Sequence, residues 1–220
     1  MAISQDLNTL LPQYSCSYCH NAVSVIETSS TAKIREVRWT NSCFHTIDCK
    51  IIKNLKSFFG SSPEILHYDC DGIITFEEDG KKYMFLSELK STFDTSDIYK
   101  AYKQIISSYI KVNVILNMSR CYNKEEYVVK GFIFSKPADK DYLMDLSKMQ
   151  QFNPRHRHRT EAELCNDVCC SRERKTKIHT NECNELKGLP LSERVLFDEM
   201  EIHFVEVSSD SIELDVHSYI

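Results

Sequence analysis

The spacing of hydrophobic residues predicts a helix followed by a β-hairpin near the middle of the chain. Residues 46–59 carry isoleucine, leucine and phenylalanine side chains at helical spacing, and Gly60 with Pro63 ends this run. Two runs rich in β-forming residues, 67–78 and 81–91, then flank an Asp-Gly turn signal. The pattern therefore predicts two antiparallel strands that follow a helix.

Three more elements follow the hairpin. Isoleucine and tyrosine side chains recur at helical spacing over residues 97–111, and the apolar segment 112–119 either extends that helix or forms a strand. Residues 127–134 predict a strand that ends before Pro137, and residues 140–151 predict another helix. The order helix, hairpin, helix, strand predicts a small α/β domain.

The regions on either side of this centre are less regular. The sequence predicts a tight turn at 16–20 and a short strand at 34–39, and two β-like runs, 200–207 and 211–219, are expected to pair as a hairpin. We divide the chain into an N-terminal Cys-containing segment, a core, a basic Cys/His-rich insert and an acidic C-terminal β segment, which span residues 1–45, 46–152, 153–192 and 193–220.

The composition is that of an ordinary globular protein. Hydrophobic residues make up 42% of the 220 residues, with only five Gly and five Pro. No run approaches the roughly 18 apolar residues that a membrane-spanning helix needs. The N-terminal residues lack the basic region and apolar core of a secretory signal, so we expect a cytoplasmic protein that does not enter a membrane.

The predicted hairpin brings acidic residues from both strands toward one lysine. Strand alternation places Glu88 and Lys90 on the same face, because they are two residues apart. A hairpin that folds about residues 79 and 80 brings Asp71 opposite Glu88, and Asp69 shares the face of Asp71 as a secondary candidate. Two carboxylates can bind Mg²⁺ beside a lysine that offsets developing charge. These residues indicate phosphodiester hydrolysis.

This arrangement resembles the PD-(D/E)XK nuclease superfamily, which has the restriction-endonuclease-like fold. The family pattern is an acid at a strand start, a hairpin, an acid-X-Lys motif on the next strand, and then a helix and a strand. Asp71 and Glu88-Leu89-Lys90 match that pattern, and Cys70 replaces the proline of the family name. The resemblance covers about residues 46–135, so the expected core is helix, β-hairpin, helix and strand.

The resemblance also implies roles for individual residues. Asp71 and Glu88 would bind Mg²⁺ or Mn²⁺ together with the backbone carbonyl of Leu89, and Lys90 would be the catalytic lysine. Gln104 matches a helical glutamine that supports the site in many members. The alternative is a solvated hairpin whose charges form weak surface ion pairs. The apolar residues of both strands favour a buried hairpin, in which carboxylates need a partner or a metal.

Ten cysteines are unusual for a protein of this length. Without a secretory signal, metal ligands or buried thiols are favoured over disulfides. Two groups have ligand types suited to structural zinc, and neither matches a standard finger spacing. They are Cys165, Cys169, His179 and Cys183 in the insert, and Cys16, Cys19 and His20 with Cys43, His45 and Cys49 near the N-terminus. The alternative for each group is a set of reduced thiols packed in the core.

The net charge of −5 is unevenly distributed. Residues 193–220 carry a net charge of −7, and residues 1–192 carry +2. A mildly basic body is compatible with a nucleic-acid partner. Candidate phosphate contacts are Lys100 and Lys111, on one polar stripe of the predicted helix with Gln104, and Arg155, Arg157 and Arg159 in the insert. A solvated helix face and a solvated loop are the alternatives.

Together these residues predict a magnesium-dependent nuclease that acts on DNA in preference to RNA. Two other functions remain open. One is a catalytically silent protein of the same fold that binds nucleic acid or serves in an assembly, and the other is a zinc-stabilised interaction protein. The sequence also leaves open a homodimer or a protein partner.

Overall fold

The computed structural model describes residues 2–14, 16–60, 64–152 and 161–220 and has a mixed α/β architecture. The described strands form one sheet in the order β1-β2-β3-β4-β5-β7-β6, and β8 pairs with β2. Pairing is parallel for β4 with β5, β5 with β7 and β2 with β8, and antiparallel elsewhere. The strands are β1 (Tyr18–Ile26), β2 (Glu36–Thr46), β3 (Gly72–Glu78), β4 (Lys81–Lys90), β5 (Tyr127–Ser135), β6 (Lys175–His179), β7 (Glu199–Glu206) and β8 (Ser211–Asp215).

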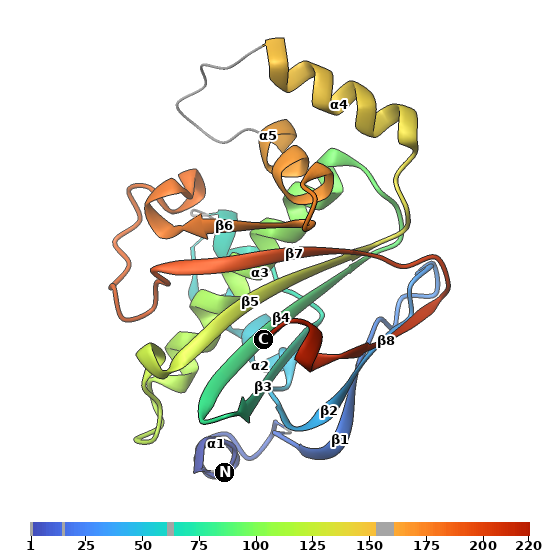
Figure 1. Cartoon of the computed structure of the whole chain (residues 1–220). Coiled ribbons are helices and arrows are strands. Elements are labelled where there is room, and N and C mark those ends of the chain that lie inside the picture. Colours follow the sequence, from blue (N-terminus) through green and yellow to red (C-terminus); the bar gives the residue numbers. More distant parts are fainter. Residues whose placement is uncertain (1, 15, 61–63, 153–160) are drawn as a thin grey trace.

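The long helix α3 packs across one face of the sheet (Figure 1). Asp94 caps its first turn through a hydrogen bond from the Ser96 amide to the Asp94 side chain. None of the described helices is both long and apolar enough to cross a membrane. The helices are α1 (Ala2–Leu10), α2 (Cys49–Leu55), α3 (Thr95–Leu116), α4 (Lys140–Phe152) and α5 (Glu161–Cys165).

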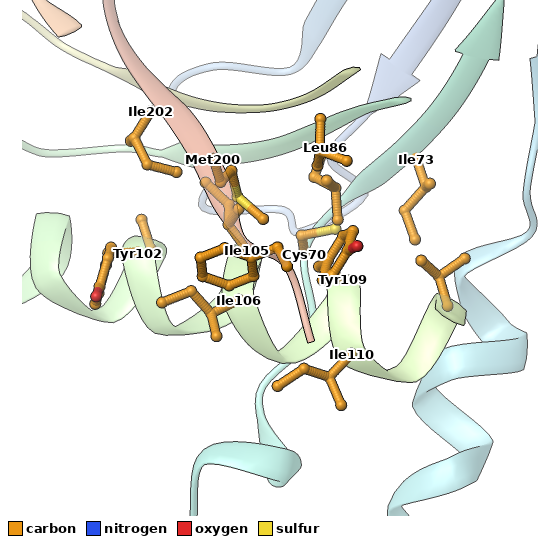
Figure 2. Packing of buried hydrophobic residues seen from close by; sticks show 14 of the residues in the cluster. Cys70, Ile73, Leu86, Tyr102, Ile105, Ile106, Tyr109, Ile110, Met200 and Ile202 are labelled. Carbon is orange, nitrogen blue, oxygen red and sulfur yellow. The ribbon is translucent and has the colours of Figure 1, made fainter. Parts of the chain in front are cut away.

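The larger hydrophobic core lies between α3 and the sheet. Ile105 and Tyr109 of α3 lie on the side of the helix that faces the strands, which contribute Ile73, Leu86, Met200 and Ile202 (Figure 2). Gly131 on β5 allows this close approach, because a Cβ atom there would lie 2.8 Å from Cγ2 of Ile105 on α3. The helix therefore holds β3, β4 and β7 against one continuous apolar layer.

The opposite face is covered by β8 and by parts of β1 and β2. A β-bulge interrupts the β1–β2 pairing, and Asn41 has a positive φ of 70°, which is typical of a strand that bends. The ring centroid of Trp39 lies 4.8 Å from that of Phe132 and 5.2 Å from that of Phe85. This second core encloses the other side of β4 and β5.

The central predictions are confirmed. The hairpin, the helix that begins near residue 97, the strand at 127–134 and the helix at 140–151 all form, and the segment 112–119 extends α3 to Leu116. The predicted tight turn at 16–20 is wrong, because β1 begins at Tyr18.

The predicted C-terminal hairpin is also wrong. The strand β7 lies between β5 and β6, where both of its edges are paired and Met200 and Ile202 are buried. The strand β8 crosses to β2 instead. The described part of the basic insert supplies β6 to this same sheet. The pairings of β7 with β5, of β8 with β2 and of β6 with β7 therefore bring into one sheet segments that the sequence analysis assigned to separate regions.

Candidate active site

The acidic residue Asp71 lies where the β3–β4 ladder ends. Gly72 pairs with Ser87, as the folding of a hairpin about residues 79 and 80 predicts. The Asp71 amide still donates to the Ser87 carbonyl at 3.0 Å, and the Leu89 amide donates to Oδ2 of Asp71 at 2.8 Å. The Asp71 carboxylate thus accepts a backbone hydrogen bond from the middle residue of the Glu88-Leu89-Lys90 motif.

The side chain of Glu88 is almost fully buried, with 3% of the residue exposed. Its Oε1 atom accepts a hydrogen bond from Nζ of Lys90 at 2.8 Å. Its Oε2 atom is buried and has no hydrogen-bond partner among the residues that the structure describes. A buried carboxylate oxygen without a partner is costly, so this atom marks a position where a cation would be stabilised.

Gln104 of α3 holds Lys90 from the other side. The Nζ atom of Lys90 donates to Oε1 of Gln104 at 2.6 Å, and Nε2 of Gln104 donates to the Asp69 carbonyl at 2.7 Å. The lysine is therefore fixed between a carboxylate on its own strand and an amide on the packed helix. Gln104 therefore contacts Lys90, and its role in supporting an active site stays a prediction.

Burial governs the ionisation of both acids. Desolvation raises the pKa of Asp71 to about 6, opposed by the hydrogen bond from the Leu89 amide. Desolvation, and then the charge of Asp71, raises the pKa of Glu88 well above its usual range, although Lys90 opposes this shift. Two carboxylates share one ammonium group, so a divalent cation would relieve both desolvation and mutual repulsion.

The residues present fit a hard divalent cation such as Mg²⁺ or Mn²⁺ better than zinc. In the described parts of the chain, no three or more His, Cys, Asp and Glu side chains are grouped to hold a metal. Mg²⁺ usually takes only one or two carboxylates and completes its shell with water and phosphate oxygens. Asp71 and Glu88 could provide that donor set, and Oε2 of Glu88 is free of hydrogen bonds from the described residues.

The secondary candidate Asp69 has a different environment. Its side chain is 3% exposed and forms ion pairs with Lys111 through Oδ1 and with Lys56 through Oδ2. Both oxygens are thus neutralised by lysines, which argues against Asp69 as a metal ligand. Gln104, Ser107 and Lys111 of the polar stripe of α3 contact this segment.

The predicted nucleic-acid contacts divide into three cases. The prediction that Lys111 contacts phosphates is wrong, because its side chain is fully buried and paired with Asp69. Lys100 is exposed on α3 and remains a candidate. Arg155, Arg157 and Arg159 lie outside the described residues.

Sequence reasoning missed the loop between β1 and β2. The Lys33 amide donates to Oγ of Ser91, the residue after Lys90, at 2.9 Å. The negative charge of Glu27 contributes to the raised pKa of Asp71, whereas the positive charge of Lys53 on α2 opposes it. No local motif could reveal this loop, because it reaches the site only through the bend of β2.

The predicted zinc clusters are not assembled within the described residues. Sγ of Cys165 donates to the Thr95 carbonyl at 3.5 Å, Cys183 contacts the Tyr102 hydroxyl, and His179 lies beside the Asp198 carbonyl. Burial raises the pKa of Cys165 to about 12 and also raises that of Cys169, so these thiols stay protonated at neutral pH.

The N-terminal pair does not converge either. Cys16 belongs to the core beneath α3, and Cys19 packs on the opposite face of the sheet. Cys16 is a small buried hydrophobe and Cys19 is only partly buried. Sγ of Cys43 lies 3.8 Å from Nδ1 of His20, but no third potential ligand joins them among the described residues.

A separate cavity of about 380 Å³ lies toward the turn of the hairpin. It is lined by residues that include Leu7, Tyr18, His45, Thr75 and Lys82, and the lining contains none of Asp71, Glu88, Lys90 and Gln104. The candidate site is assigned to Asp71, Glu88 and Lys90, because the volume of a cavity does not by itself indicate a reaction.

Comparison with known proteins assigns no family or function to this chain. The sequence matches no protein-family model, and no significant match was found among curated proteins or solved structures.

Proposed function

We propose that this protein is a divalent-metal-dependent nuclease that hydrolyses phosphodiester bonds in an active site formed by Asp71, Glu88 and Lys90. The observation that carries the proposal is the buried Oε2 atom of Glu88, which has no partner although Lys90 already pairs with Oε1. An acid in that position gains most from a bound cation. The succession α2, β3, β4, α3 and β5, with β4 parallel to β5, supports a restriction-endonuclease-like core.

Each residue has a role in this proposal. Asp71 and Glu88 would hold Mg²⁺ or Mn²⁺ with the carbonyl of Leu89, and such an ion would polarise the phosphoryl group and acidify a water. Lys90 carries the only positive charge hydrogen-bonded to Glu88 among the described residues, so it stabilises negative charge that develops on the phosphate. Gln104 orients Lys90 through the hydrogen bond to Nζ.

The proposed substrate is nucleic acid, with DNA favoured over RNA by the family resemblance. Lys53 and Lys100 are exposed on the two helices nearest the site. Their charges can contact phosphates on either side of the bond that is cleaved.

A direct test compares cleavage of plasmid DNA, single-stranded DNA and RNA with Mg²⁺, with Mn²⁺ and after chelation. Wild-type protein should cleave at least one substrate only with metal, and Glu88→Gln and Lys90→Ala should each lose that activity. Glu77→Gln is the matched control, because Glu77 is an exposed acid on the same hairpin. Equal cleavage by all four proteins would reveal a contaminant and refute the proposed mechanism.

A nucleic-acid-binding role without cleavage is the main alternative. It would give salt-sensitive binding that Lys90→Ala leaves unchanged, with no metal-dependent product from the wild-type protein.

A further inference from the structure

A buried ion pair lies directly behind the candidate active site. Lys111 has no exposed surface, and its ammonium group contacts Oδ1 of Asp69 and the Tyr68 carbonyl. Burial lowers the pKa of Lys111, and the charge of Asp69 opposes that shift. Lys56 approaches the other oxygen of Asp69 from the more exposed side. The Asp69 carboxylate therefore joins α3 to the segment that follows α2.

Side chains of α3 form hydrogen bonds with the backbone of the three residues before Asp71. Ser107 donates to the Tyr68 carbonyl at 2.7 Å, and the Cys70 amide donates to Oγ of Ser108 at 2.7 Å. Gln104 donates to the Asp69 carbonyl at 2.7 Å. Consecutive backbone groups of residues 68–70 are thus bound by side chains of one helix. This fixes the position at which the chain enters β3.

The same network reaches Lys90. Gln104 uses one end of its amide for the Asp69 carbonyl and the other end for Nζ of Lys90. The position of the Asp69 backbone and the position of the Lys90 ammonium are therefore set by one side chain. A displacement of residue 69 would move Gln104, and with it the lysine.

Stability alone gives a poor reason for this arrangement. A buried ion pair must overcome the desolvation of both charges, and apolar pairs of similar volume are often as stable or more stable. A pair of this kind fixes geometry well because the charges tolerate few alternative positions. Here the geometry that it fixes is the approach to Asp71 and the support of Lys90.

We propose that Lys111 and Asp69 are positioning residues that hold Asp71 and Lys90 in register for metal binding and cleavage. This inference rests on the proposed nuclease function. Neither residue touches the substrate. They act through the Tyr68–Cys70 backbone and through Gln104.

The test separates positioning from stability with a charge-neutral double variant. Asp69→Asn with Lys111→Met removes both charges and leaves no unpaired buried ion at Lys111. We expect the urea midpoint of this variant to stay near that of the wild type, Mn²⁺ to bind at least tenfold more weakly, and kcat to fall at least tenfold. KM for DNA should change less than threefold, because the variant leaves the exposed surface intact.

Hydrogen exchange reports the anchoring without metal. In the double variant, the amide of Asp71 should exchange faster while amides within β3 and β4 keep their protection. Lys130→Met is the matched control, since it removes another partly buried lysine, paired with Glu201, on the opposite face of the sheet. It should leave Mn²⁺ affinity, kcat and the Asp71 amide unchanged.

A double variant that keeps wild-type Mn²⁺ affinity and kcat would overturn the positioning role. If that variant fails to fold, Ser107→Ala with Ser108→Ala loosens the same segment without removing a charge. Unchanged Mn²⁺ affinity and kcat in that milder variant would also overturn the inference. By contrast, a wild-type protein that neither binds Mn²⁺ nor cleaves nucleic acid would refute the proposed function itself.

Discussion

The ammonium of Lys90 lies 2.8 Å from one carboxylate oxygen of Glu88, while the other oxygen of Glu88 is buried without a partner. A surface ion pair would leave both oxygens in contact with water. The reading of these charges as a solvated hairpin is therefore wrong. The imbalance of two acids against one lysine gives the candidate site properties that can be measured without a substrate.

Neutralising either acid should stabilise the metal-free protein. Glu88→Gln and Asp71→Asn remove a buried charge, so we expect the free energy of unfolding at pH 7 to rise by on the order of 1–3 kcal/mol. Urea denaturation in the presence of a chelator measures this. The exposed Glu77→Gln should change stability by less than about 0.5 kcal/mol. A loss of stability in both site variants would contradict the electrostatic account of the site.

The pKa of Asp71 predicts how stability depends on pH. Its folded value of about 6 lies above the ordinary value of about 3.9, so the folded state holds the proton more tightly. The stabilisation is complete below pH ~3.9 and is lost as the pH rises through 6, a change of at most about 3 kcal/mol. Comparing wild type with Asp71→Asn across this range isolates it. Parallel stability curves for the two proteins would contradict the shifted pKa.

Metal binding should have the opposite pH dependence. A protonated Asp71 cannot bind a divalent cation, so Mn²⁺ affinity should weaken at least about tenfold for each pH unit below 6, and more steeply where Glu88 is protonated as well. Calorimetric titration with MnCl₂ between pH 5 and pH 7.5 tests this. Affinity that does not change between pH 5 and pH 7.5 would place the metal elsewhere.

Removing Lys90 should separate catalysis from metal binding. Lys90→Met deletes the charge that stabilises the phosphate, and we expect cleavage to fall by at least about 100-fold. Mn²⁺ affinity should stay the same or increase, because the competing ammonium is gone. Gln104→Ala should lower cleavage less, since Lys90 keeps its hydrogen bond to Glu88. Weaker Mn²⁺ binding in Lys90→Met would make the lysine a structural support of the metal site.

Gly72 should be intolerant of a side chain. A Cβ atom at this position would lie 2.4 Å from Cγ2 of Val25, so Gly72→Ala should cost about 1–3 kcal/mol. Combining it with Val25→Ala should recover part of that loss, and a double-mutant cycle by urea denaturation measures the coupling. If the two substitutions change the free energy of unfolding additively, Val25 on β1 does not clash with a side chain at position 72.

The hairpin and its acid positions could be predicted because local rules determine them. Asp79 and Gly80 both have positive φ, as the Asp-Gly signal implies, and that turn fixes the register that sets Asp71 beside the Glu88-Leu89-Lys90 segment. Gln104 was a candidate only through the family resemblance, which expects a supporting glutamine on the helix that follows the hairpin. None of these inferences needed a contact between distant segments.

The remaining features depend on contacts that local patterns do not encode. Periodicity places Lys111 on a polar stripe, but it cannot distinguish a stripe that faces solvent from one that binds a buried backbone segment. The two C-terminal β runs alternate like a hairpin, yet the β7–β8 loop binds the start of β2, where the Arg35 amide donates to the Asp210 carbonyl. Choosing between these outcomes requires the whole sheet.

The central place of β7 also affects how the protein forms as it is made. The hairpin that carries the candidate site needs only residues near one another in the chain. In contrast, one edge of β5 stays open until β7 has been synthesised, because Lys130–Ser135 pair with Glu201–Glu206. An exposed edge invites pairing with other chains. A nascent chain that stops before Glu199 should therefore depend on chaperones and aggregate even though its site hairpin is complete.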